Sequence, residues 1–254
     1  MLVVEADGEV EAARDAIGAA VRRQNERRHV TGQKLRFLRE AGIRFRLRHE
    51  NIIRIFHAGT LPDGRPFIRM ERFSGETLQD FLDARPVTVE ESVGIVGRLA
   101  SALEHAHARS IYHRDLKPSN VLVSASLDEL RLIDFGLGIL VEEAVARSRL
   151  TTSAHQFGGA YSAPELLENA KVVGPHLDVY SLGAVWFRLL AGRAPQGTGI
   201  DQAIEVCDLH PDLKTLLRRC LSAPADRPSM RDVLNQLRSW HRSHVGVNPG
   251  GGKR

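Results

Sequence analysis

The chain has 254 residues, of which 43% are hydrophobic and 26% charged, a composition typical of a globular protein with a sizeable core. The formal net charge is +4, but aromatic residues make up only 6%, so the basic character indicates solvated surface rather than a nucleic-acid-binding face. No apolar run is long enough for a membrane span, and the acidic N-terminus is unlike a secretory signal.

The first part of the chain has the pattern of a small β-structure. Pro62-Asp63-Gly64 is typical of a tight turn between two of the predicted strands. An arginine-rich helical pattern covers residues 33–48. The predicted strands are residues 3–6, 9–14, 18–23, 52–58 and 65–72.

From about residue 75 the pattern becomes helical. Thr88 and Glu91 have the spacing of a capping box, and the apolar residues behind them recur every three or four positions, which predicts a long helix to His107. Residues 179–190 are apolar nearly all round, which predicts a buried central helix. The other predicted helices are residues 77–84, 213–221 and 229–240. Residues 241–254 end in glycines and charges and are predicted to be a disordered tail.

The cysteines give no sign of a metal site. Cys207 and Cys220 belong to no CxxC pattern and no His/Cys cluster, which argues against structural zinc. Unpaired cysteines of this kind fit a reducing compartment, so we expect a cytoplasmic protein.

A polar stretch after the long predicted helix has the residues that phosphoryl transfer needs. Such transfer depends on positioning and charge neutralisation rather than covalent chemistry. Asp115 can accept a hydroxyl proton, and Lys117 can stabilise the transferring group as a point charge. Asn120 and Asp134 offer hard oxygen ligands for Mg²⁺. The stretch reads His113-Arg114-Asp115-Leu116-Lys117-Pro118-Ser119-Asn120 and is followed by Asp134-Phe135-Gly136.

These two motifs resemble the catalytic loop and the metal-binding loop of protein kinases. The resemblance implies that Asp115 is the catalytic aspartate and that Asn120 and Asp134 bind the metal. Lys117 is typical of the serine/threonine kinases, and Arg114 resembles the arginine that pairs with a phosphate on the activation segment. Candidate phosphorylation sites in that segment are Ser148, Thr151, Thr152 and Ser153.

Later motifs extend the resemblance through the helical part. Ala163-Pro164-Glu165 resembles the end of the activation segment, and the stretch from Asp178 to Gly183 resembles the start of the helix that anchors the catalytic loop. The arginine of Ala225-Asp226-Arg227-Pro228-Ser229 pairs with the Ala-Pro-Glu glutamate in this family. We therefore predict a buried Glu165–Arg227 ion pair.

The resemblance continues upstream into the part of a kinase that holds ATP. Glu40 takes the place of the αC-helix glutamate, and Met70 that of the gatekeeper before the hinge. Backbone groups of Glu71 and Phe73 would bond the adenine edge. Gly8 and Val10 match the end of the glycine-rich loop.

Several positions depart from the family pattern. The first two glycine positions hold Val3 and Glu5, and the usual phosphate-pairing lysine is Arg22. Arg22 keeps the charge but replaces a compact ammonium by a planar fork. Lys34 is six residues before Glu40 and so faces away from it, which excludes it as a substitute. Gly158 stands where the family has a threonine that braces the catalytic loop.

The resemblance implies an α+β, two-lobed protein kinase fold. Residues 1–73 would form an N-lobe with a small antiparallel sheet and the αC helix, and residues 74–240 a larger, mainly helical C-lobe. The implied function is a serine/threonine protein kinase of the bacterial eukaryotic-like type, with ATP and Mg²⁺ as cofactors and an unidentified protein substrate. A pseudokinase that acts as a binding scaffold is the alternative, motivated by Arg22 and the altered glycine loop; the retained metal ligands favour the enzyme.

Overall fold

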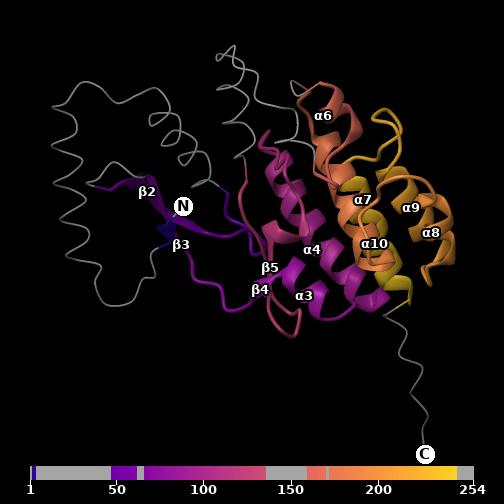
Figure 1. The fold of residues 1–254 in the computed structure, drawn as a ribbon, viewed down its shortest axis with the longest axis horizontal. Helices are drawn as coiled ribbons and strands as arrows, with labels where there is room; N and C mark the ends of the chain where they lie inside the picture. The colour runs from indigo at the N-terminus through magenta and orange to yellow at the C-terminus, as the bar shows by residue number, and fades with distance from the viewer. Residues whose placement is uncertain (1, 4–46, 62–65, 136–158, 170–171, 245–254) are drawn as a thin grey trace, which may run out of the picture.

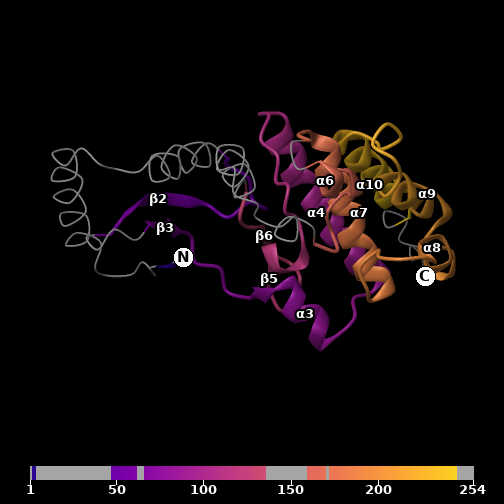
Figure 2. The ribbon, with the colours of Figure 1, turned by 45° about the horizontal axis from the view of Figure 1, so that its top comes forward.

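The computed structural model describes residues 2–3, 47–61, 66–135, 159–169 and 172–244. Strands β2 and β3 lie at one end of the molecule and the helices at the other, with β4, β5 and β6 between them (Figures 1 and 2). A small β-part followed by a larger helical part is the arrangement that the sequence predicts.

The first sheet is built on a hairpin. β2 (Ile55–Thr60) pairs with β3 (Pro66–Met70) in antiparallel fashion, with Ala58 opposite Ile68. This confirms the predicted hairpin, although β2 begins three residues later than the predicted strand and β3 ends two residues earlier. The short β1 (Leu2–Val3) lies on the other edge of β3 and runs parallel to it. Parallel neighbouring strands need a long connection, and the chain between β1 and β3 supplies it.

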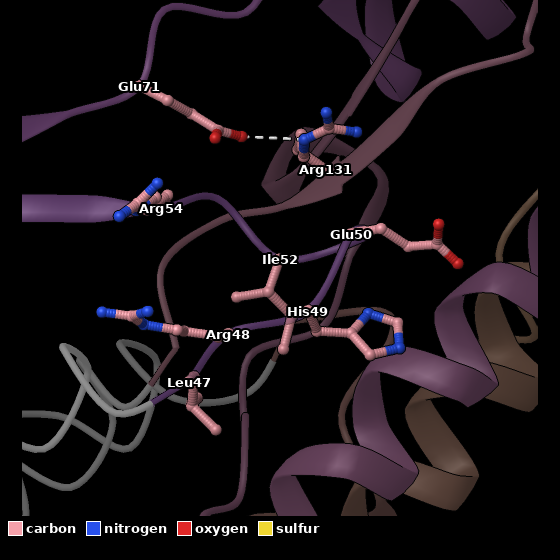
Figure 3. A pocket seen from close by; sticks show the side chains of 8 residues that line it. All are labelled: Leu47, Arg48, His49, Glu50, Ile52, Arg54, Glu71 and Arg131. Atoms are coloured by element: carbon pink, nitrogen blue, oxygen red, sulfur yellow. Dashed lines mark hydrogen bonds and ion pairs between the residues drawn. The ribbon is translucent and has the colours of Figure 1, made fainter.

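The second sheet joins the two parts of the molecule. Its strands are β4 (Glu76–Thr77), β5 (Val121–Val123) and β6 (Leu130–Leu132), in the order β4-β5-β6. Ile52 forms an isolated bridge with Leu132, so the segment before β2 lies against β6 (Figure 3). Gly75 precedes β4, and a Cβ at this position would lie 2.1 Å from the Val123 carbonyl oxygen. Only glycine allows the chain to approach β5 this closely.

The helical part contains the predicted helices and two short ones that were not predicted. α4 (Val89–His107) begins at the predicted capping box, in which Thr88 accepts from the Glu91 N–H and Glu91 accepts from the Thr88 N–H. α7 (Pro175–Ala191) begins earlier than predicted, at a proline suited to the first helical position, and ends at Gly192 with φ of 70°. The others are α3 (Leu78–Ala84), α6 (Pro164–Glu168), α8 (Ile200–Val206), α9 (Pro211–Cys220) and α10 (Met230–His244).

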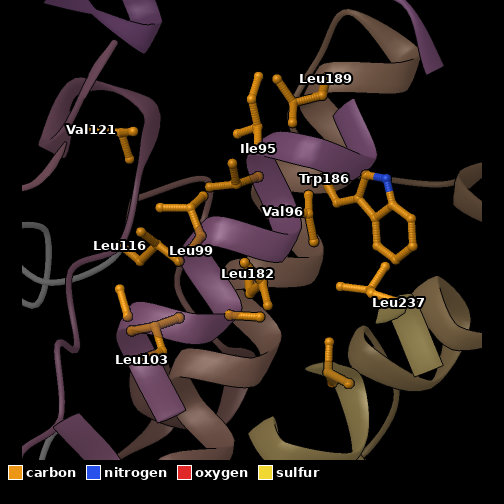
Figure 4. Close-up of a cluster of buried hydrophobic side chains, with 14 of the residues drawn as sticks. Ile95, Val96, Leu99, Leu103, Leu116, Val121, Leu182, Trp186, Leu189 and Leu237 are labelled. Carbon is orange, nitrogen blue, oxygen red and sulfur yellow. The ribbon is translucent and has the colours of Figure 1, made fainter. Parts of the chain in front are cut away.

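The core lies between α4, α7 and the C-terminal helices. Ile95, Leu99 and Leu103 on one face of α4 are fully buried, and Leu182 and Trp186 of α7 pack in the same cluster (Figure 4). Leu237 of α10 and Leu116 and Val121 of the loop and strand after α4 extend it. The loop that carries the polar motif is therefore fixed to the largest hydrophobic cluster of the described residues.

Two further predicted boundaries are wrong. α10 continues to His244, four residues into the predicted disordered tail, because no glycine or proline interrupts the chain before Gly246. Leu47 and Arg48 were predicted to end a helix, but they lie outside any helix, in the segment that leads to the bridge at Ile52. The rest of that predicted helix and the predicted strands at residues 9–14 and 18–23 lie outside the described residues.

Candidate active site

Asp115 lies at the centre of a small hydrogen-bonded group in the loop between α4 and β5. Its carboxylate oxygen Oδ2 accepts from Lys117 Nζ at 2.7 Å and from Asn120 Nδ2 at 3.1 Å. Asn120 Nδ2 also donates to the Asp115 carbonyl at 2.7 Å. The Asp115 side chain is 49% exposed, so the carboxylate is oriented by Lys117 and Asn120 and still reaches solvent. The structure thus brings together the three residues predicted to act in catalysis.

The backbone of this loop is held by a buried carboxylate. Asp178, in the first turn of α7, is fully buried. Its Oδ2 accepts from the His113 N–H at 2.8 Å and lies 2.7 Å from His107 Nε2, and its Oδ1 accepts from the Arg114 N–H at 2.7 Å. Burial alone would raise the pKa of Asp178, but its interactions with His107, His113 and the Arg114 N–H together outweigh burial, and the pKa is lowered. An ionised carboxylate in the core therefore fixes the turn before Asp115.

Arg114 has φ of 65°, a left-handed conformation uncommon for a residue with a side chain. Asp178 accepts from the N–H of Arg114 and from that of the preceding His113, which holds the backbone at this residue in place. The Arg114 side chain is largely buried and donates to the Val172 carbonyl at 3.1 Å. It therefore links the loop to the segment between α6 and α7.

The sheet register brings the second motif next to the first. The Ile133 N–H donates to the Asn120 carbonyl at 3.0 Å, so Asp134 is the next residue beyond this pair. His113 Nε2 lies 2.9 Å from the Ile133 carbonyl, and its ring packs against the ring of Phe135 at 4.8 Å between centroids. Asp134 has φ of 60°, so the second motif, like the first at Arg114, contains a left-handed residue. Backbone strain of this kind persists only where surrounding contacts hold it, and it is often found at functional sites.

Asn120 and Asp134 offer oxygen ligands of the type that Mg²⁺ bound to phosphates prefers. The described residues contain no cluster of three or more His, Cys, Asp or Glu that could hold a metal. Mg²⁺ in a nucleotide site needs only one or two protein ligands, because phosphates and waters complete its shell. Both Asn120 side-chain hydrogen bonds run from its amide nitrogen to Asp115, so they do not use its amide oxygen, and Asp134 follows the residue whose N–H bonds the Asn120 carbonyl. The two residues therefore fit the role that the sequence predicts.

The predicted hinge follows β3 directly. Met70 is the last residue of β3, and the Glu71 N–H donates back to the Arg54 carbonyl at 2.9 Å. Within the described part of the chain, the Glu71 carbonyl and the Phe73 N–H and carbonyl make no backbone hydrogen bond. These are the three backbone groups predicted to bond adenine.

The predicted Glu165–Arg227 ion pair is present. Both nitrogens of the guanidinium fork bond the two carboxylate oxygens, one of them at 2.9 Å, and the Arg227 side chain is only 1% exposed. Arg227 also donates to the carbonyls of Ser222 and His176 and lies over the Tyr180 ring. Burial would raise the pKa of Glu165, but the bond from Arg227 lowers it. The pair ties the α6 segment to the loop before α10.

Several predicted site residues lie outside the described residues. They are Gly8, Val10, Arg22 and Glu40 of the predicted ATP-holding part, Gly158, and the candidate phosphorylation sites Ser148, Thr151, Thr152 and Ser153.

Two contributors to the site were not predicted. His107 falls on the apolar face of α4, and a histidine at a core position is a signal that a buried partner is needed. Arg131 contacts Glu71 from β6, and no local pattern connects residues so far apart in the chain.

The protein kinase domain model matches residues 8–237. This chain belongs to the protein kinase family. Among its relatives, the serine/threonine-protein kinase PknJ of Mycobacterium tuberculosis is 35% identical over 70% of this chain, and PkaA of Streptomyces coelicolor 34% identical over 80%. The chain covers only 30% of PknJ and 39% of PkaA.

Solved structures agree with the two-lobed kinase fold predicted from the sequence. The PknI kinase domain of Mycobacterium tuberculosis superimposes with a TM-score of 0.63 at 27% identity, covering 83% of this chain and 79% of that one. Rad53, solved with AMP-PNP, superimposes with a TM-score of 0.62 at 23% identity, covering 78% of this chain and 53% of that one, and supports the fold alone. Among the described residues, no helix is both long and apolar enough to cross a membrane.

Proposed function

We propose that this chain is an ATP-dependent serine/threonine protein kinase domain that transfers the γ-phosphoryl group of Mg²⁺–ATP to protein hydroxyls. The observation that carries the proposal is the Asp115 carboxylate, oriented by Lys117 and Asn120 on a loop that buried Asp178 holds. Membership of a family whose relatives are named serine/threonine-protein kinases supports it and does not favour the pseudokinase alternative. The N-lobe would comprise residues 1–73 and the C-lobe residues 74–240.

Each residue of the group has a task in such a transfer. Asp115 orients the acceptor hydroxyl and receives its proton, while Lys117 compensates negative charge next to it. Asn120 and Asp134 would hold Mg²⁺, which when bound neutralises the phosphate oxygens. The Glu71 carbonyl and the Phe73 N–H and carbonyl would bond the adenine edge.

The test is label transfer from γ-labelled ATP to a generic basic protein, compared with Asp115→Asn. Removing a general base costs about 10²–10⁴-fold in rate, so the variant should transfer little label. Asp208→Asn is the matched control, because Asp208 is exposed in the loop after α8 and should leave transfer unchanged. Label on serine or threonine would support the role of Lys117. A folded wild type that transfers no more label than Asp115→Asn would refute the proposal.

A further inference from the structure

An ion pair behind the predicted hinge connects it to β6. Arg131 Nε donates to Glu71 Oε1 at 2.8 Å, and the two side chains are only 23% and 26% exposed (Figure 3). The guanidinium also lies over the Phe73 ring, 5.5 Å from its centroid, and donates to the Leu130 carbonyl at 3.1 Å. One side chain therefore contacts both ends of segment 71–73. We call Arg131, Glu71 and Phe73 the hinge clamp.

A chain of backbone bonds connects the same two segments. The Leu132 N–H donates to the Asn51 carbonyl at 2.8 Å, and the Ile53 N–H donates to the Leu132 carbonyl at 3.0 Å. The next residue, Arg54, accepts from the Glu71 N–H at 2.9 Å. The hinge is thus joined to β6 twice, by this backbone relay and by the clamp. β6 leads directly to Asp134, two residues after Leu132.

Two members of the clamp, Arg131 and Glu71, line a cavity. The cavity has a volume of about 180 Å³, and Glu71, Arg131, Arg54 and the turn from Leu47 to Glu50 line it. In Figure 3 the Arg131 side chain extends toward Glu71 at the edge of this space. Loss of the Arg131 side chain would enlarge an existing cavity and would leave the packing of α4 and α7 intact.

We propose that Arg131 is a positioning residue for the nucleotide, acting through Glu71 and Phe73. If the proposed function holds, ATP spans from the hinge backbone to the metal beside Asp134. The clamp fixes the distance between these two ends before the nucleotide binds, which removes part of the ordering cost of binding. A guanidinium can stack on Phe73 and bond Glu71 at once, which a lysine ammonium cannot do with the same geometry.

The test compares Arg131→Ala, Arg131→Lys and Glu71→Gln with the wild type. Arg131→Ala should raise both the Kd for Mg²⁺–ATP and the KM for ATP at least about threefold. The reason is that Arg131 contacts Glu71 and Phe73 directly, and residues in contact are energetically coupled. kcat, the KM for the protein acceptor and the thermal midpoint should change little. Arg131→Lys should lie between the alanine variant and the wild type. Glu71→Gln combined with Arg131→Ala should weaken ATP binding by less than the product of the single effects.

Arg231→Ala is the matched control, because Arg231 also pairs with a glutamate but is 73% exposed on α10. It should leave ATP binding unchanged. An unchanged Kd for Mg²⁺–ATP in Arg131→Ala would overturn the positioning role, and so would a change confined to kcat or to the thermal midpoint. A folded wild type that binds no Mg²⁺–ATP would overturn the proposed function and this inference together, whereas binding that is insensitive to Arg131 overturns only the inference.

Discussion

The catalytic loop and the hinge are both held in place by ionised side chains, but at very different depths. Asp178, which holds the loop, is fully buried and accepts from two backbone N–H groups beside its contact with His107. Arg131 and Glu71, which hold the hinge, each keep about a quarter of their surface exposed. A buried charge is costly to leave without partners, while a partly exposed one can turn to water. Loss of the Asp178 carboxylate should therefore destabilise the whole fold, whereas loss of the Arg131–Glu71 pair should alter the hinge without unfolding the protein.

The largest effect is expected for Asp178→Asn. The amide keeps the volume but replaces one accepting oxygen by an NH2 group, which can only donate, opposite the N–H groups of His113 and Arg114. Breaking a buried charged network typically costs about 3–5 kcal/mol. Urea denaturation should show a loss of this size, and label transfer should fall further than the folded fraction alone explains.

Asp83→Asn is the control for this measurement. Asp83 pairs with Arg188 at 3.3 Å, but its side chain is 60% exposed. Its loss should cost less than about 1 kcal/mol. Equal costs for the two variants would mean that burial does not distinguish the loop anchor from a surface pair.

Arg227→Met tests a buried pair that lies away from the catalytic loop. It leaves the Glu165 carboxylate and the carbonyls of Ser222 and His176 without their donor, at a cost of about 3 kcal/mol. Adding Glu165→Gln should recover part of the loss, since it removes the unpaired charge. Denaturation of both variants measures this, and a double variant less stable than Arg227→Met would contradict the explanation.

The parts of the site that belong to short sequence motifs were predictable from the sequence. The capping box at Thr88 and the loop around Asp115 each left a short signature, and the family resemblance implied the Glu165–Arg227 pair although its members are 62 residues apart. The contact between Arg131 and Glu71, 60 residues apart, was not predicted, because neither residue belongs to a motif that pairs it with the other. α6 spans only five residues, which is too short to show helical periodicity.

Thr88→Ala separates helix stability from loop geometry. Thr88 caps the end of α4 opposite to His107, which contacts Asp178. Loss of an N-cap typically costs about 1 kcal/mol. The unfolding free energy should fall by about this amount, while the KM for ATP and kcat of the folded protein stay unchanged. A marked fall in kcat would show that the cap also affects the loop.

The smallest effect is expected from pH, at the contact between the turn before β2 and α4. The rings of His49 and His105 lie 5.1 Å apart. His49 Nδ1 accepts from the Asn51 N–H at 3.0 Å, and its Nε2 lies 3.1 Å from Ser101 Oγ, so the geometry requires a neutral ring. Desolvation by burial and the neighbouring His105 lower the pKa of His49, although Glu50 and Glu104 oppose them. Desolvation and Arg109 lower the pKa of His105 in the same way, against Glu104.

The sign of the pH effect follows from these lowered pKa values. The unfolded chain takes up protons near pH 6.5, the ordinary histidine value, and the folded protein only at lower pH. Stability is thus fully present above about pH 6.5 and is lost as pH falls through the lowered folded pKa. Buried His113 contributes in the same direction, because desolvation lowers its pKa too.

The carboxyl groups of Glu91 and Glu165 have lowered pKa values and stay ionised between pH 7.5 and 5.5. Unfolding free energies at these two pH values should therefore differ less in a His49→Gln/His105→Gln variant than in the wild type. Because both rings are partly exposed, the difference should be smaller than the cost of Thr88→Ala. Equal pH dependence in the two proteins would mean that protonation of His49 and His105 does not destabilise this junction.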